Sequence, residues 1–271
     1  MLKYLFPALL LVHIGCQSVP SSEKSKGESS KTLDAANSTN KLVTFERFSV
    51  LDSNTSTSDT TWFRVQYPEI ENPQVSQWIQ HIALGSDSLT LEEAASQFLK
   101  EHKEVYRGDQ FDRAWIQDIE LYITRQHRTY WGLTRLFYTY TGGAHGMFLT
   151  EYLHVDPINK VFIPSDELIN VELMPELTSQ AEKAFRKAES LSEDAKLDEN
   201  YFFENGTFYL PSNFTFEQDS ISFVYGLYEI KPYVHGETFL RLAYSDIQKH
   251  LTPKAKELLK NAVTLTPKPV Q

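Results

Sequence analysis

Two short strings in the chain carry the residue types that could do chemistry. The first spans 138–146 and reads YTYTGGAHG, and the second spans 228–236 and reads YEIKPYVHG. Each string combines tyrosines with a histidine–glycine pair. Histidine can transfer a proton or bind a metal near neutral pH, and tyrosine offers rigid contact area with one polar group. The strings are therefore candidates for catalysis, metal binding or recognition of another molecule.

The first string places a histidine among three glycines at the predicted end of a strand. Glycine permits positive φ or a close approach of another chain, so the tyrosine-bearing strand can turn sharply here. Three interpretations of His145 remain open: a structural histidine that bonds a loop carbonyl, part of a ligand-contacting surface, and a metal ligand or catalytic base. Metal spacing such as H-x-x-x-H or H-E-x-x-H is absent from the sequence.

The second string is interrupted by Pro232, which cannot donate to a sheet ladder. It predicts either a bent connection that packs its tyrosines into the core or a tyrosine-lined recognition edge. We predict a ligand-binding site without a metal or a cofactor. Its residues are Tyr138, Tyr140, Gly142, Gly143, His145, Tyr228, Tyr233 and His235.

Catalytic machinery is not evident in the sequence. A G-x-S-x-G nucleophile elbow is missing. Asp118 and Glu120 share a predicted strand face, but paired carboxylates on a protein surface are usually solvated. We therefore predict no catalytic residues and no enzyme. The alternative is an envelope hydrolase that acts on peptidoglycan or peptides, with a site formed by convergence of His145, His154 and His235.

Cys16 is the only cysteine of the chain and follows a short apolar N-terminal run. The run is too short to span a bilayer, and Lys3 supplies the positive charge of a signal peptide. The pattern indicates a bacterial lipoprotein signal at 1–15, with a lipid added to the Cys16 thiol, although His13 stands where such signals usually have leucine. An ordinary secretory signal is the alternative. Gln17 favours the outer membrane, facing the periplasm, if the host is Gram-negative.

Composition divides the remainder of the chain. A polar stretch at 16–41 predicts a disordered tether, and 264–271 predicts a disordered tail. Between them we expect two domains, at 42–160 and 161–263. The net charge of −10 argues against nucleic acid as a partner. It favours encounter with cationic proteins, although acidity also serves solubility.

Periodicity predicts the elements that must position the two strings. Helices are expected at 73–84, 90–105, 175–191, 245–251 and 253–261, and strands at 44–50, 62–67, 115–125, 131–140, 147–155, 161–163, 207–210, 214–217, 220–226 and 238–244. Thr90 and Glu93 have the spacing of a capping box. The predicted fold class is α+β: antiparallel sheets with helices packed on one face, in two intimately associated subdomains and without a β-α-β crossover.

The two strings in this order resemble those of known bacterial envelope proteins, over roughly 44–251. The first resembles the accessory domain of PdaC-type peptidoglycan deacetylases. Together they resemble the extracellular portion of RsiV-type anti-sigma factors, which bind lysozyme. The resemblance implies a binding domain outside the cytoplasm, with a lysozyme-like cationic protein or peptidoglycan as its partner. The chain lacks the catalytic domain of PdaC and the sigma-binding segment of RsiV, so deacetylation and signalling are not implied.

Overall fold

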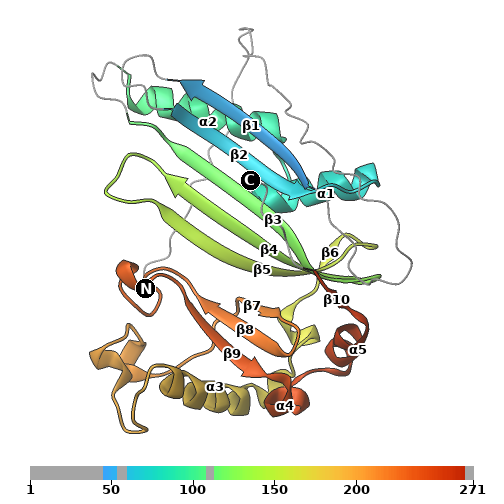
Figure 1. Cartoon of the computed structure of the whole chain (residues 1–271), viewed down its shortest axis with the longest axis vertical. Coiled ribbons are helices and arrows are strands. Elements are labelled where there is room, and N and C mark those ends of the chain that lie inside the picture. Colours follow the sequence, from blue (N-terminus) through green and yellow to red (C-terminus); the bar gives the residue numbers. More distant parts are fainter. Residues whose placement is uncertain (1–44, 54–59, 108–112, 266–271) are drawn as a thin grey trace.

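The computed structural model describes residues 45–53, 60–107 and 113–265. The predicted signal peptide, tether and Cys16 lie outside the described residues, as does the tail from 266. The described chain forms a large sheet and a small sheet, each with its own helices (Figure 1). The α+β fold class with antiparallel sheets is confirmed. Within these residues, no helix has the length and apolar character needed to cross a bilayer.

The large sheet has the strand order β1-β2-β3-β4-β5-β6, with β10 beside one end of β3. Its strands are β1 (Phe45–Ser53), β2 (Thr60–Pro68), β3 (Ile116–His127), β4 (Tyr130–Tyr140), β5 (Met147–Asp156), β6 (Val161–Phe162) and β10 (Val263–Thr264). β10 occupies residues that include the first position of the predicted tail, and Leu265 after it is buried.

One strand pair differs from the prediction. β2 and β3 run parallel, in the register Trp62 to Ile116 through Gln66 to Glu120, so the expectation of no β-α-β crossover was wrong. Parallel neighbours need a long crossover, and α1 (Pro73–Leu84) and α2 (Leu91–Val105) supply it. Both helices pack on one face of the sheet, and the chain then enters β3 beside β2 in the same direction.

The ends of these two helices are encoded locally. Asn72 caps α1 by accepting from the backbone N–H groups of Gln74 and Val75. At the start of α2, Thr90 accepts from the N–H of Glu93 while Glu93 accepts from the N–H of Thr90, so the predicted capping box is present.

The helices cover one face of the large sheet and leave the other accessible. Ile79 of α1 and Phe98 of α2 share a core with Phe63, Ile119 and other inward side chains. Alternation along the strands places Leu136, Tyr138 and Phe148 on the opposite face, which we call the open face. Each of these three side chains is at least 36% exposed.

The small sheet is antiparallel, with the order β7-β8-β9. Its elements are β7 (Phe214–Phe216), β8 (Ser220–Tyr225), β9 (Thr238–Ala243), α3 (Met174–Ala188), α4 (Tyr244–Ile247) and α5 (Pro253–Asn261). Short 3-10 turns are η1 (Ser165–Glu167), η2 (Val171–Leu173), η3 (Leu197–Glu199), η4 (Glu204–Gly206), η5 (Tyr233–His235) and η6 (Gln248–His250). α3 and α4 lie on the side of β9 away from the large sheet (Figure 1).

Two expectations in this half were wrong in detail. Residues 207–210 form no strand: Phe208 is buried in an aromatic core with Phe185 and Phe203, and the carbonyl of Tyr209 accepts from the hydroxyl of Tyr225 at 2.6 Å instead of from a neighbouring strand. The helix predicted at 245–251 is divided into α4 and η6.

Side chains, not strand pairing, join the two sheets along the edge of β5. The carboxylate of Glu237 accepts from the N–H and the hydroxyl of Thr150, at 2.7 and 2.6 Å. The amide of Asn213 donates to the carbonyl of Thr150 at 2.7 Å and accepts from the N–H of Tyr152 at 2.8 Å. Tyr130 of β4 is fully buried in the core of the small-sheet half. The two halves therefore fold against each other intimately.

Candidate recognition site

The structure brings members of both strings together where β4 and β5 of the large sheet meet the turn before β9. The ring of His145 stacks on that of Tyr233, with centroids 3.8 Å apart and planes inclined by 22°. Tyr228 and Phe148 flank Tyr233, at centroid distances of 5.6 and 6.5 Å. Tyr138 lies directly opposite Phe148 on β4. We call Tyr138, His145, Phe148, Tyr228 and Tyr233 the aromatic strip.

The carbonyl of Gly146 joins the two strings. It accepts from the hydroxyl of Tyr233 at 2.7 Å and from Nδ1 of His145 at 3.0 Å. Gly146 is buried, and a Cβ at this position would overlap the ring of Tyr138. Only glycine therefore lets the chain turn beneath the Tyr138 ring and present its carbonyl to the second string.

The other two glycines of the first string have different roles. Gly142 has φ +85°, which favours glycine, and its carbonyl accepts from the guanidinium of Arg113 at 2.6 Å. A side chain at Gly143 would meet open space, apart from the carbonyl of His145 at 3.9 Å. Gly142 is thus needed for the turn, whereas the structure gives no conformational reason for glycine at position 143.

Tyr228 holds a backbone conformation that is unusual for a bulky residue. Its φ is +61°, and its side chain is 49% exposed. The turn is held by the carboxylate of Glu229, which accepts from the N–H of Gly226 at 2.7 Å and from the hydroxyl of Tyr209 at 2.8 Å. Such strain is of order 1–3 kcal/mol and tends to cluster at functional sites. Here it places an exposed ring against Tyr233, with its hydroxyl 3.5 Å from Nε2 of His145.

The remaining predicted residues lie beside the strip. Tyr140 is half-buried at the end of β4, paired with Ile116. His235 is exposed at the end of η5. The following Gly236 has φ +69° and approaches the ring of Phe148. Phe148 was missed by the sequence reasoning, although the alternation of β5 and its place opposite Tyr138 are signals that could have found it.

His154, the third member of the hypothetical catalytic group, is enclosed in the core. Its Nδ1 accepts from the hydroxyl of Tyr130 at 2.9 Å, and its Nε2 donates to the carbonyl of Phe214 at 3.1 Å. Burial lowers its pKa to about 4, partly opposed by the bond to Phe214. The imidazole is therefore neutral near pH 7, and both ring nitrogens are engaged. Among the described residues, no three His, Cys, Asp or Glu side chains are grouped as metal ligands.

The open face continues the strip with a small cavity of about 250 Å³. Its lining includes Asp118, Glu120, Leu136, Tyr138 and Phe148. Neighbouring side chains donate hydrogen bonds to both carboxylates. Asp118 accepts from Nε of Arg64 at 2.8 Å, and Glu120 accepts from the hydroxyl of Tyr122. The hydrogen bond to Asp118 raises the pKa of Arg64. The strip is thus bordered by anchored charges instead of freely solvated ones.

Residues 166–245 match the domain family described as "Protein of unknown function (DUF3298)". This stretch runs from the turn after β6 to the middle of α4, so it takes in the second string, the small sheet and α3. The similarity to this family model therefore concerns the small-sheet half of the fold. None of the curated proteins matches the chain.

Two solved structures have a similar fold. A DUF3298-family protein from Bacteroides fragilis NCTC 9343 is 17% identical, with a TM-score of 0.63. A DUF3298-family protein from Pseudomonas aeruginosa PAO1 is 16% identical, with a TM-score of 0.58. In each comparison the match covers 80% of this chain and 97% of the other. The likeness therefore extends over both sheets, and at these identities it concerns the fold alone.

Proposed function

We propose that this chain is a non-catalytic cell-envelope lipoprotein that binds an extracytoplasmic protein through the aromatic strip. Its N-terminal lipid on Cys16 holds it at a membrane, on the outer membrane facing the periplasm in a Gram-negative host. The favoured partner is a lysozyme-like cationic protein, as the resemblance to RsiV-type and PdaC-type proteins implies. Peptidoglycan is the other partner that this resemblance suggests.

The observation that carries the proposal is the aromatic strip itself. Interface hot spots are enriched in tyrosine and in other large aromatic residues, and the strip gathers three tyrosines, a phenylalanine and a histidine from both halves of the fold. Tyr138, Phe148 and Tyr228 are 37%, 37% and 49% exposed. Since the strain at Tyr228 is maintained for a ring that is half in solvent, packing within the core does not account for it.

The charge of the chain supports a cationic partner. The net charge is −10, and electrostatic attraction of this kind raises association rates at low salt. The hydrolase alternative needs a free base next to a nucleophile. His154 is enclosed and neutral, so this alternative would have to rely on His145 or His235.

The first experiment is a calorimetric titration of the purified full-length chain with hen egg-white lysozyme. We expect binding that weakens as salt rises, because surface charges are screened. Co-sedimentation with insoluble peptidoglycan tests the other partner, and release of soluble fragments in the same assay would favour the hydrolase. If neither lysozyme nor peptidoglycan binds, the result contradicts both proposed partners.

A pair of variants tests whether the strip is the site. Tyr228→Ala removes an exposed ring of the strip, and we expect lysozyme binding to weaken about tenfold or more, as for a hot-spot aromatic. Phe162→Ala is the matched control, because Phe162 is an exposed aromatic (56%) on β6, outside the strip. Equal lysozyme affinities of the two variants would contradict the assignment of the binding site to the strip.

A further inference from the structure

A second pocket lies at the other end of the large sheet, where β3 ends and β4 begins. It is open to solvent and has a volume of about 560 Å³, within the range of small-molecule sites. Its polar and aromatic lining consists of Asn72, Gln126, His127, Arg128, Trp131 and Asn261. We call it the polar pocket. It shares no lining residue with the aromatic strip.

Existing hydrogen bonds decide what its two asparagines can offer a ligand. The side-chain oxygen of Asn72 accepts from the N–H groups of Gln74 and Val75, at 3.0 and 3.2 Å. Its NH₂ group is therefore what remains to donate to a ligand. Asn261 has the reverse arrangement, since its NH₂ donates to the carbonyl of Glu257 at 3.1 Å. Its oxygen remains to accept.

Hydrogen bonds also decide which ring nitrogen of His127 can donate to a ligand. Nδ1 of His127 accepts from the N–H of Thr129 at 3.4 Å and lies 3.1 Å from the Thr129 hydroxyl. In the neutral ring the proton then resides on Nε2, which becomes a donor. Arg128 is exposed and adds a guanidinium, which suits a carboxylate geometrically.

The charge of the pocket is opposite to that of the chain. Carboxylates outnumber basic groups in the sequence, 36 to 26. Yet none of the lining side chains within the described ranges is acidic, while one is arginine and one histidine. Trp131 adds a half-buried indole. A flat aromatic surface, an amide donor, an amide acceptor and a guanidinium thus come together in one recess.

We propose that the polar pocket binds an acidic N-acetylated saccharide. A sugar ring lies on the indole of Trp131, and its acetamido carbonyl accepts from Asn72. The acetamido N–H donates to the side-chain oxygen of Asn261, and the carboxylate pairs with Arg128. A free carboxylate on an N-acetylated sugar is the chemistry of a peptidoglycan glycan strand whose stem peptides have been removed. The inference therefore rests on the proposed envelope location but not on the aromatic strip.

The test is calorimetric titration of the purified full-length chain with the disaccharide of N-acetylglucosamine and N-acetylmuramic acid. Diacetylchitobiose is the matched probe, since it has the same acetamido groups without the carboxylate. We expect the acidic disaccharide to bind about tenfold more tightly, because a charge-assisted hydrogen bond to Arg128 distinguishes the two. Failure of both sugars to bind at millimolar concentration would overturn the proposal.

Two exposed positions provide variants with little risk to folding. Arg128→Gln should bring the affinity for the acidic disaccharide down to that for chitobiose. Asn72→Ser retains a side-chain oxygen that can cap α1 but loses the NH₂ donor, so it should weaken both sugars alike. Lys187→Gln, exposed on α3, is the charge-matched control and should bind like the parent.

The outcomes separate this site from the aromatic strip. Arg128→Gln and Asn72→Ser should leave lysozyme binding unchanged, and Tyr228→Ala should leave disaccharide binding unchanged. Parental affinity of Arg128→Gln for the acidic disaccharide would contradict the assignment, whatever the lysozyme titration shows.

Discussion

The side chain of Asn213 occupies the position of a neighbouring strand along the outer edge of Thr150. Its NH₂ donates to the carbonyl of Thr150 at 2.7 Å, and its oxygen accepts from the N–H two residues further on, at Tyr152, at 2.8 Å. One amide thus supplies the donor and acceptor that a paired strand would supply. Exposed strand edges invite unwanted pairing, and here the edge of β5 is used to dock the second half of the fold.

Replacement of Asn213 tests this docking. Asn213→Ala leaves a backbone N–H and a carbonyl without partners at the junction, and we expect the free energy of unfolding to fall by about 1–3 kcal/mol. Denaturant unfolding followed by circular dichroism measures the change. Asn200→Ala, at an exposed position, should stay within about 0.5 kcal/mol of the parent. Equal effects of the two replacements would contradict the role of Asn213.

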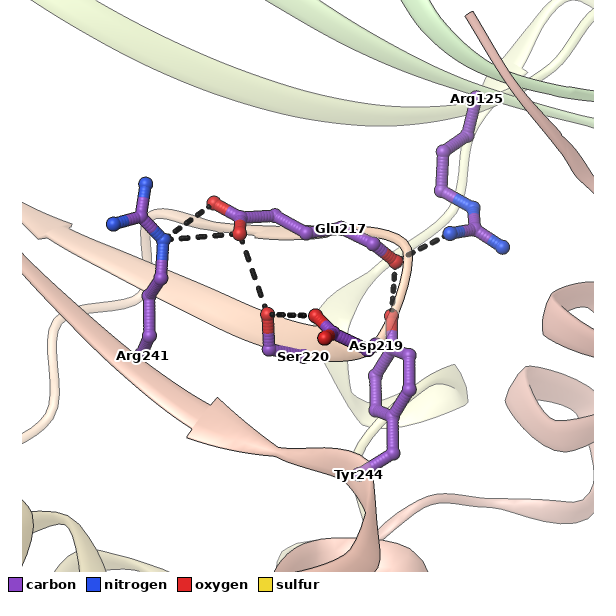
Figure 2. Close-up of polar contacts among 6 residues, drawn as sticks. All are labelled: Arg125, Glu217, Asp219, Ser220, Arg241 and Tyr244. Carbon is purple, nitrogen blue, oxygen red and sulfur yellow. Dashed lines mark hydrogen bonds and ion pairs between the residues drawn. The ribbon is translucent and has the colours of Figure 1, made fainter.

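Arg125 forms a second link between the halves, from a bulge in β3 (Figure 2). Its guanidinium donates to the carbonyl of Glu217 in the β7–β8 turn, to the carbonyl of Leu259 in α5 and to the hydroxyl of Thr264 in β10. Figure 2 shows that the Glu217 carbonyl also accepts from the hydroxyl of Tyr244. The carboxylate of Glu217 accepts from Nε of Arg241 and from the hydroxyl of Ser220. The side chain of Arg125 is only 3% exposed.

The geometry of Arg125 predicts that lysine cannot replace it. A guanidinium presents donors in a rigid planar fork, whereas an ammonium is a compact point charge. We expect both Arg125→Lys and Arg125→Met to lower the free energy of unfolding by about 2 kcal/mol or more, since hydrogen bonds to a charged donor are lost. Thermal unfolding measures this, with Arg107→Met at an exposed site as the control. Parental stability of Arg125→Lys would show that charge alone suffices.

Buried His154 predicts a loss of stability in mild acid. Its pKa is about 4 in the folded chain, against an ordinary value of 6.5, because burial disfavours the charged ring. Between these values the unfolded state binds more protons, so the free energy of unfolding falls as pH drops from 6.5 towards 4. The full shift corresponds to about 3 kcal/mol.

The measurement is urea unfolding at several pH values between 4 and 7. His154→Gln retains a donor for the Phe214 carbonyl and an acceptor for the Tyr130 hydroxyl but cannot titrate. Its stability should therefore depend less steeply on pH than that of the parent in this window. Parallel pH profiles for the two chains would show that His154 is not responsible.

His145 distinguishes a structural histidine from a recognition histidine. It is exposed, stacks on Tyr233 and bonds the Gly146 carbonyl. Because Tyr233 also donates to that carbonyl, we expect His145→Ala to change the free energy of unfolding by no more than about 0.5 kcal/mol. Lysozyme binding should weaken. A large drop in melting temperature with binding intact would instead assign His145 a structural role.

The proposed lipid anchor is tested through Cys16, outside the described residues. Cys16→Ser removes the thiol that would carry the lipid, so the chain should move from the membrane fraction to the soluble extracytoplasmic fraction. Immunoblotting of fractionated cells measures this. Persistent membrane association of Cys16→Ser would favour an ordinary signal or another mode of attachment.

Elements defined by neighbouring residues could be predicted from the sequence alone. The bounds of α1 and the capping box of α2 agree with the prediction, because caps and helical periodicity depend on contacts three or four residues apart. Four of the five residues of the strip also came from the two short strings, and Phe148 is the exception. What could not be predicted was that Gly146 would join the strings through its carbonyl, with Tyr233 as donor from 87 residues away.

Residue patterns alone were enough to predict the α+β class, most helices and strands, and the tyrosines and glycines that deserved testing. The parallel pairing of β2 with β3, the burial of His154 and the links made by Asn213 and Arg125 became visible in the folded chain alone. These features join residues 60 to 139 positions apart or require a choice of neighbouring strand. Local propensity contains no information on such pairings, because they are selected by which apolar faces and unpaired backbone groups the whole chain can bury together.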